Sequence, residues 1–137
     1  MPAKRRDVRE SAFILTFEML FRDDPVEEIF ESAAALDDVV VNDEIKSVVR
    51  GVIENSDSLD QKIAAFSDKR SIARIPRINL AILRLAIYEA LYDDKVPVNV
   101  AISEAVKLAE KYAFESDVSF INGILGSFAR DLEKSDA

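Results

Sequence analysis

Apolar residues recur at helical spacing along nearly the whole chain, and no segment shows the alternation of a β-strand. The clearest stripe consists of Ile45, Val48, Val49, Val52 and Ile53, at positions i, i+3, i+4, i+7 and i+8. That spacing places the five side chains on one helix face, which needs a neighbour to pack against. The chain is therefore predicted to be all-α, with about seven helices.

Helix starts are predicted at residues whose side chains can cap a first turn. Pro25 follows one such residue, and proline is favoured at the first helical position. The helix over 76–92 is apolar all round except at Asn79 and Arg84, which predicts that it is buried at the middle of the fold. The predicted caps are Asp24, Ser58, Asn99 and Ser116, and the longest predicted helices cover 4–22, 76–92, 99–112 and 116–132.

Composition excludes several classes of protein. The 137 residues are enough for one compact domain, and the chain has neither cysteine nor histidine. Disulfides, thiolate metal sites and histidine-based catalysis are thereby excluded, so we expect no enzymatic activity, metal or cofactor. No apolar run is long enough for a membrane span or a signal peptide, and a cytoplasmic location is expected.

Cations cluster at the start of the first predicted helix, in a chain whose net charge is −8. Arg5 and Arg9 are i and i+4, Arg6 lies beside them, and Phe13 follows four residues after Arg9. Cations next to aromatic rings are what proteins use to bind single-stranded RNA. The alternative is a solvated, frayed helix end, because short basic runs have low specificity.

Two further basic features lie near the buried helix. The stretch 69–77 contains four cations and no acid, which is typical of a solubilising loop. Arg84 has apolar neighbours, so its guanidinium must reach water, an acid or a ligand. It either pairs with a carboxylate at the edge of the core, such as Glu89 or Glu104, or projects into an RNA cleft.

Two of the three glycines, Gly123 and Gly126, fall inside the last predicted helix. Each costs about 1 kcal/mol of helix propensity relative to alanine, so a compensating role is expected. Bare backbone at i and i+3 permits close packing of another helix, which is the expected role, or close approach of a ligand. Asn122, a polar residue in an apolar run, is expected either to make a buried hydrogen bond to a neighbouring helix or to contact a base.

Four segments occur in a fixed order: RRDVRESAF (5–13), AILRLAIYEALY (81–92), VPVNVAISEAVKLAEKYA (96–113) and FINGILG (120–126). In this order and at this spacing they resemble the NusB family of bacterial transcription antitermination factors, over nearly the whole chain. The resemblance implies an all-helical fold of two small packed bundles, at about residues 1–55 and 56–137, that together form a single RNA-binding domain.

The resemblance also implies a function. Members of the family bind the boxA element of ribosomal RNA leader transcripts together with NusE, a small-subunit ribosomal protein, and promote read-through by RNA polymerase. The implied partners are single-stranded boxA-like RNA, NusE and the RNA polymerase antitermination complex. Two rival classes stay open: a protein-interaction scaffold with lost or weak RNA binding, and an RNA-binding module related to ribosomal RNA cytosine methyltransferases, although no cofactor domain is found in these 137 residues.

Positions matching the family's RNA-binding segments lie at both ends of the chain, and phenyl and phenol rings nearby are expected to contact unstacked bases. Asp7 and Ser119 stand where relatives carry a basic residue, and Asn79–Leu80 replaces a charged pair, so RNA binding without NusE is expected to be weak. The predicted RNA contacts are Lys4, Arg5, Arg6, Arg9, Phe17, Arg84, Tyr112, Glu115, Ser116, Ser119, Phe120 and Asn122, and the predicted NusE contacts are Arg77 and Asn79.

Overall fold

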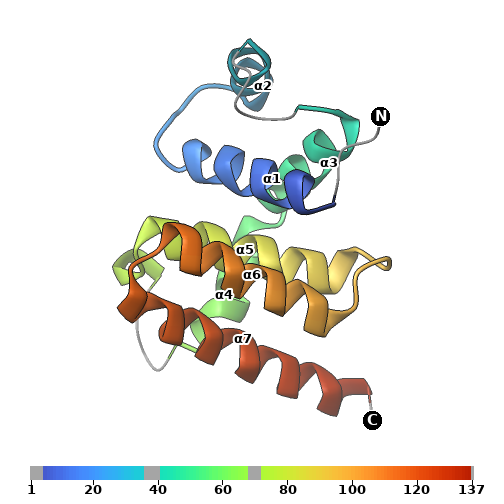
Figure 1. The fold of residues 1–137 in the computed structure, drawn as a ribbon, viewed down its shortest axis with the longest axis vertical. Helices are drawn as coiled ribbons and strands as arrows, with labels where there is room; N and C mark the ends of the chain where they lie inside the picture. Colours follow the sequence, from blue (N-terminus) through green and yellow to red (C-terminus); the bar gives the residue numbers. More distant parts are fainter. Residues whose placement is uncertain (1–4, 36–40, 68–71, 137) are drawn as a thin grey trace. The chain divides into compact units, whose positions relative to one another are not determined.

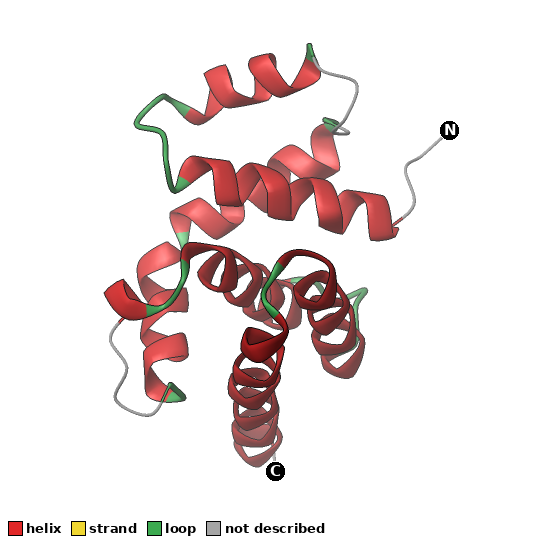
Figure 2. Ribbon diagram, turned by 60° about the vertical axis from the view of Figure 1, so that its left-hand side comes forward, coloured by secondary structure: helices red, strands yellow, loops and turns green. Residues whose placement is uncertain are grey.

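The computed structural model describes residues 5–35, 41–67 and 72–136, with backbone alone for Arg5, Ser135 and Asp136. Over these ranges the chain is helical and contains no strand, as predicted (Figures 1 and 2). None of the described helices is long and apolar enough to cross a membrane. The elements are α1 (Arg5–Met19), α2 (Val26–Ala34), α3 (Asp43–Glu54), α4 (Ser56–Ala65), a 3-10 turn (Ile72–Arg74), α5 (Arg77–Tyr92), α6 (Val98–Tyr112) and α7 (Glu115–Asp136).

The chain divides into two compact units, Met1–Asn55 and Ser56–Ala137. In the first unit, α1 packs against both α2 and α3 (Figure 1). The predicted stripe on α3 faces this core through Ile45, Val49 and Val52, which are all buried. Because those residues recur at helical spacing, burying one face of α3 is enough to fix its orientation in the unit.

The link between α1 and α2 differs from the prediction. Pro25, and not Asp24, is the cap of α2, and no side chain caps that helix. Asp24 instead accepts a hydrogen bond from Arg22 Nε at 2.7 Å, while Arg22 Nη1 donates to Glu18 at 2.7 Å. These bonds, to Glu18 first and then to Asp24, raise the pKa of Arg22 above its ordinary value. The carboxylate of Asp24 is therefore engaged by a cation and not by backbone N–H groups.

In the second unit, α5 contacts α4, α6 and α7, and it is the most extensively buried helix (Figure 1). This confirms the burial predicted from its apolar sequence. The last helix packs through one stripe that includes Ile121, Ile124, Leu125 and Phe128, all buried. Positions i, i+3, i+4 and i+7 thus face the core, and the rest of the α7 surface is left to form grooves.

Helix starts elsewhere in the second unit also precede the predicted caps. Ser58, Asn99 and Ser116 lie one or two residues inside α4, α6 and α7. Proline explains the shift for α6, because Pro97 is the cap residue, with φ −60° and ψ 148°, and it directs the chain straight into the helix. A proline, Pro76, also precedes α5, as predicted.

Candidate nucleic-acid interface

The structure describes only part of the basic segment at the start of α1. Lys4 lies outside the described residues, and Arg5 begins the helix but its side chain is not described. Arg6 is exposed, whereas Arg9 is only 5% exposed. Asp7, next to Arg6, is exposed as well. Among the described side chains of this segment, Arg6 is thus the cation that reaches the surface.

Three phenylalanines form a row of ring contacts along α1 and just beyond it. Phe13 and Phe17 stack with centroids 6.0 Å apart, and Phe17 meets Phe21 edge to face at 5.1 Å. Exposure rises along this row, from 1% at Phe13 to 56% at Phe21, with Phe17 half-buried. Arg6 and Phe17 are separated by roughly 16 Å along the helix axis. Arg9 and Phe13 are both buried, so neither is accessible to RNA in this structure, and contact of Arg9 with RNA stays a prediction.

Arg84 is held by an acid that sequence reasoning did not identify. Its Nε and Nη2 atoms donate to the two carboxylate oxygens of Asp60 on α4, each at 2.7 Å. Both side chains are largely buried, at 17% and 19% exposure. The expected pairing with a carboxylate is therefore confirmed, but the partner is Asp60 and neither Glu89 nor Glu104, and the ion pair joins α5 to α4. A contact of Arg84 with RNA stays a prediction.

The predicted NusE contacts, Arg77 and Asn79, have different surroundings. Arg77 is exposed at the start of α5, and Arg74 is exposed in the preceding turn, whereas Lys69 and Arg70 lie outside the described residues. Asn79 is completely buried, and neither polar atom of its amide has a hydrogen-bond partner in the described chain. Arg77 is thus accessible to a partner, and Asn79 is not in this conformation.

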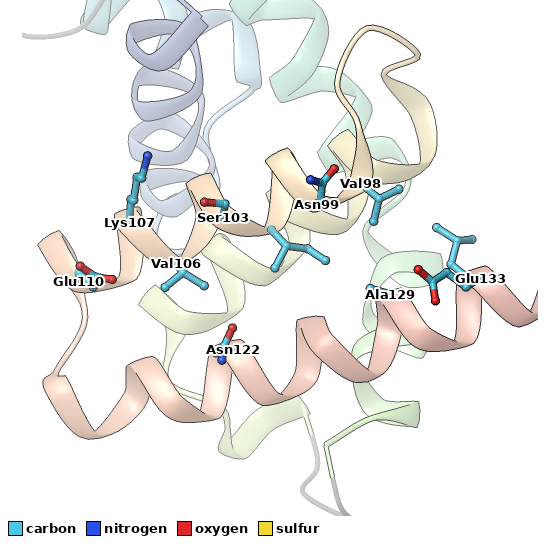
Figure 3. A pocket seen from close by; sticks show the side chains of 11 residues that line it. Val98, Asn99, Ser103, Val106, Lys107, Glu110, Asn122, Ala129 and Glu133 are labelled. Atoms are coloured by element: carbon cyan, nitrogen blue, oxygen red, sulfur yellow. The ribbon is translucent and has the colours of Figure 1, made fainter.

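The predicted contacts on α7 separate onto two faces. Asn122 lies in a groove of about 660 Å³ between α6 and α7, named here the Asn122 groove, where its amide points from α7 toward α6 (Figure 3). The side chain is exposed, so the first alternative, a buried hydrogen bond to a neighbouring helix, is not what the structure shows, and contact with a base stays a prediction. The other residues of this groove are Val98, Asn99, Ile102, Ser103, Val106, Lys107, Glu110, Ala129, Leu132 and Glu133.

Phe120 and Ser119 open instead onto a second groove, about 460 Å³ in volume, named here the Gly123 groove. Because successive helical residues are rotated by about 100°, Phe120 and Asn122 point roughly 160° apart around α7. One bound nucleotide therefore does not contact both side chains from a single groove. The Gly123 groove is lined by Phe66, Ser67, Ser119, Phe120, Gly123, Ile124, Ser127 and Arg130.

The glycines of α7 do not serve the close helix packing that was expected. A Cβ built on Gly123 would have no heavy atom within 4 Å, and Gly123 is exposed. A Cβ on Gly126 would meet Arg130 Nη1 at 3.4 Å, which is a side chain of the same helix. The helix-propensity cost of about 1 kcal/mol at each position is therefore not offset by contact with another helix.

The remaining predicted contacts surround the turn between α6 and α7. Tyr112 ends α6, half-buried, and Lys111 Nζ lies 5.2 Å from the centre of its ring. Glu115 and Ser116 are exposed in the first turn of α7. Phe114, directly before α7, is 79% exposed. Its ring is therefore an available stacking surface at this turn, and it was missed because single exposed aromatics leave no sequence pattern.

Phe66 and Arg130 were also missed. The spacing of Ser119, Gly123, Ser127 and Arg130, at i, i+4, i+8 and i+11, could have indicated a shared helix face. Phe66 follows α4, and nothing local in the sequence indicates that it lies against α7.

Comparison with known proteins identifies the family. The NusB family model matches residues 6–130. Transcription antitermination protein NusB of Acetivibrio thermocellus is 42% identical over 128 residues, which cover 92% of this chain and 88% of that protein. The structure of NusB from T. maritima superposes with a TM-score of 0.83 at 32% identity, covering all of both chains. A crystal structure of antitermination factors NusB and NusE in complex with dsRNA has the same fold, with a TM-score of 0.80 at 22% identity, covering 93% of this chain and 96% of that one. The chain belongs to the NusB family.

Proposed function

We propose that this protein is a transcription antitermination factor that binds boxA RNA of ribosomal RNA leader transcripts together with NusE and promotes read-through by RNA polymerase. The observation that carries the proposal is the family match over residues 6–130. It is supported by the 42% identical relative, which is named a transcription antitermination protein. A NusB of the same fold has been crystallised with NusE and dsRNA, which supports NusE and RNA as partners without indicating a single strand.

Exposed groups on two helices support contact with unpaired RNA. Arg6 at the start of α1 is an accessible cation for a phosphate, and Phe120 on α7 is an accessible ring for a base. Bases can stack on protein rings only where they are not stacked within a duplex, so single-stranded RNA is the proposed ligand. Arg5 and Lys4 would add phosphate contacts beside Arg6.

The charge of the chain explains why a second protein is proposed. Its net charge is −8, and Asp7 lies beside Arg6, so the long-range field opposes a polyanion. Each phosphate contact supplies affinity through counterion release, and few exposed cations mean few such contacts. NusE is proposed to contribute the remaining RNA contacts and to dock near Arg77, which is exposed.

The proposal is tested by titrating a labelled single-stranded boxA-like RNA and a scrambled RNA of the same composition, with and without NusE. At about 0.1 M salt, we expect boxA-like RNA to bind at least about tenfold more tightly than the scrambled RNA when NusE is present, because base contacts add to phosphate contacts. Binding without NusE should be weaker for both. Fluorescence anisotropy gives the four affinities.

Equal affinity for the two RNAs in the presence of NusE would contradict sequence-specific recognition. If neither RNA binds with or without NusE, while NusE itself still associates with the protein, the scaffold class replaces the proposed one. A duplex of the same boxA-like sequence serves as the control for strandedness, and it should bind less tightly than the single strand.

A further inference from the structure

At Gly123 the groove is lined by backbone without a side chain, and no part of the described protein fills the space beside it. Gly123 is exposed, and its missing side chain leaves space with no heavy atom within 4 Å. A glycine in the middle of a 22-residue helix is unfavourable, and here no internal packing contact requires it. What the glycine does provide is an open groove of about 460 Å³, within the range of roughly 300–1,000 Å³ typical of ligand sites.

Two aromatic rings line this groove. Phe66 and Phe120 line it and are both half-buried, so part of each ring is accessible. Phe66 is held by an edge-to-face contact with Phe128, at 6.4 Å between centroids and an interplanar angle of 73°. Phe128 itself is 4% exposed and belongs to the core stripe of α7. A ring fixed in this way presents a stacking surface that needs no ordering when a base arrives.

Arg130 supplies positive charge at this groove, and no acid is among the described residues that line it. Its Nη2 atom donates to Ser127 Oγ at 3.1 Å, and its Nη1 atom lies against bare backbone, 3.4 Å from where a Cβ of Gly126 would be. The guanidinium thus lies back along α7, toward Gly123. The Asn122 groove differs, because Glu110 and Glu133 line it together with Lys107. Phosphate is accordingly favoured in the Gly123 groove and disfavoured in the other.

We propose that the Gly123 groove binds one unstacked nucleotide of single-stranded RNA, with its base against the ring of Phe66 or Phe120 and its phosphate on Arg130. Gly123 then has a role, because its missing side chain leaves room for the nucleotide. This proposal rests on the proposed function, since it places one nucleotide of the RNA that the protein is proposed to bind. It extends the RNA contact of α7 from its start to Arg130.

Gly123→Leu tests the base position, because the leucine side chain would occupy the part of the groove beside Gly123, and leucine also favours a helix more than glycine does. Stacking of one base contributes about 5- to 150-fold in affinity, so the dissociation constant for single-stranded boxA-like RNA in the presence of NusE should rise at least about fivefold. The melting temperature should not fall. Ala34→Leu, an exposed position on α2 that lines neither groove, is the control and should change the affinity less than about twofold.

Arg130→Gln tests the phosphate position. Loss of one phosphate contact should lower the slope of log K against log salt by about 0.7, whereas Gly123→Leu should lower affinity without changing the slope. Lys95→Gln removes the same charge from the exposed turn before α6 and should leave the slope unchanged. In protein labelled with ¹⁵N-glycine, only three amide signals are present, and RNA should shift the signal of Gly123.

Two failures are distinguishable. If wild-type protein with NusE binds RNA, yet the Gly123 signal does not move and both Gly123→Leu and Arg130→Gln bind like wild type, the groove is not a nucleotide site and the proposed function stands. If the wild-type protein with NusE binds no RNA, both proposals are overturned. A fall in melting temperature for Gly123→Leu would also contradict the open groove, because it would mean that the added side chain clashes with the protein.

Discussion

Leu125→Ala is expected to lower the free energy of unfolding by about 3–4 kcal/mol, and the melting temperature by roughly 10 °C. Leu125 is completely buried in the stripe by which α7 packs against the rest of the second unit. Removing it leaves a cavity that surrounding helices fill only in part, so the lost contacts add to the lost hydrophobic transfer energy. Urea denaturation followed by far-ultraviolet circular dichroism measures the change.

Leu132→Ala is the matched control on the same helix. Leu132 is half-buried at the edge of the Asn122 groove, so the same truncation should cost less than about 1 kcal/mol. Equal losses in the free energy of unfolding for the two variants would mean that the buried stripe of α7 is not what holds this helix in place. The position of the two grooves that α7 lines would then not be explained by its packing.

Asp60→Ala is expected to cost about 2–3 kcal/mol, the second-largest effect. It would leave the Arg84 guanidinium, 17% exposed, without the two oxygens to which it donates at 2.7 Å. A largely buried charge that loses its partner is strongly destabilising, whereas removing both partners is much less so. The double variant Asp60→Ala/Arg84→Ala should therefore be less destabilised than the sum of the single variants, by about 1–2 kcal/mol in a double-mutant cycle.

The exposed pair of Arg50 and Glu27 provides the comparison. Its side chains are 42% and 61% exposed, so Glu27→Ala should cost less than about 1 kcal/mol. Additive losses of stability for Asp60→Ala and Arg84→Ala would contradict the pairing.

RNA titration of folded Arg84→Ala separates the two roles left open for this arginine. An unchanged slope of log K against log salt assigns Arg84 to the core alone, and a slope lower by about 0.7 assigns it a phosphate contact as well.

The all-α fold and the position of each helix followed from local sequence. Stripes such as Ile45, Val49 and Val52 are visible in the chain because one helix generates the whole pattern, and the structure confirms that they are buried. The exact starts were predicted less well. Pro25 and Pro97 begin their helices without a side-chain cap, so the nearby Asp24 and Asn99 were assigned a capping role that they do not have.

The surfaces could be predicted only in part, because they depend on residues far apart in the chain. Asp60 and Arg84 are separated by 24 positions, and their pairing requires that α4 and α5 already be packed together. Phe66 likewise reaches the face of α7 through tertiary structure. Gly123 shows the opposite difficulty. Its cost in helix propensity was evident in the sequence, but a glycine that lets another helix pack closely and a glycine that leaves a groove open have the same local sequence pattern.

The proposed RNA contact at the start of α1 depends on a few arginines in a chain of net charge −8. The most direct test is the salt dependence of boxA-like RNA binding, with NusE present, for Arg5→Ala/Arg6→Ala and for Lys95→Ala/Lys107→Ala, which removes the same charge elsewhere. Two lost phosphate contacts should lower the slope of log K against log salt by about 1.4 in the first variant and leave it unchanged in the second. Identical slopes for both variants and wild type would contradict RNA binding by the start of α1.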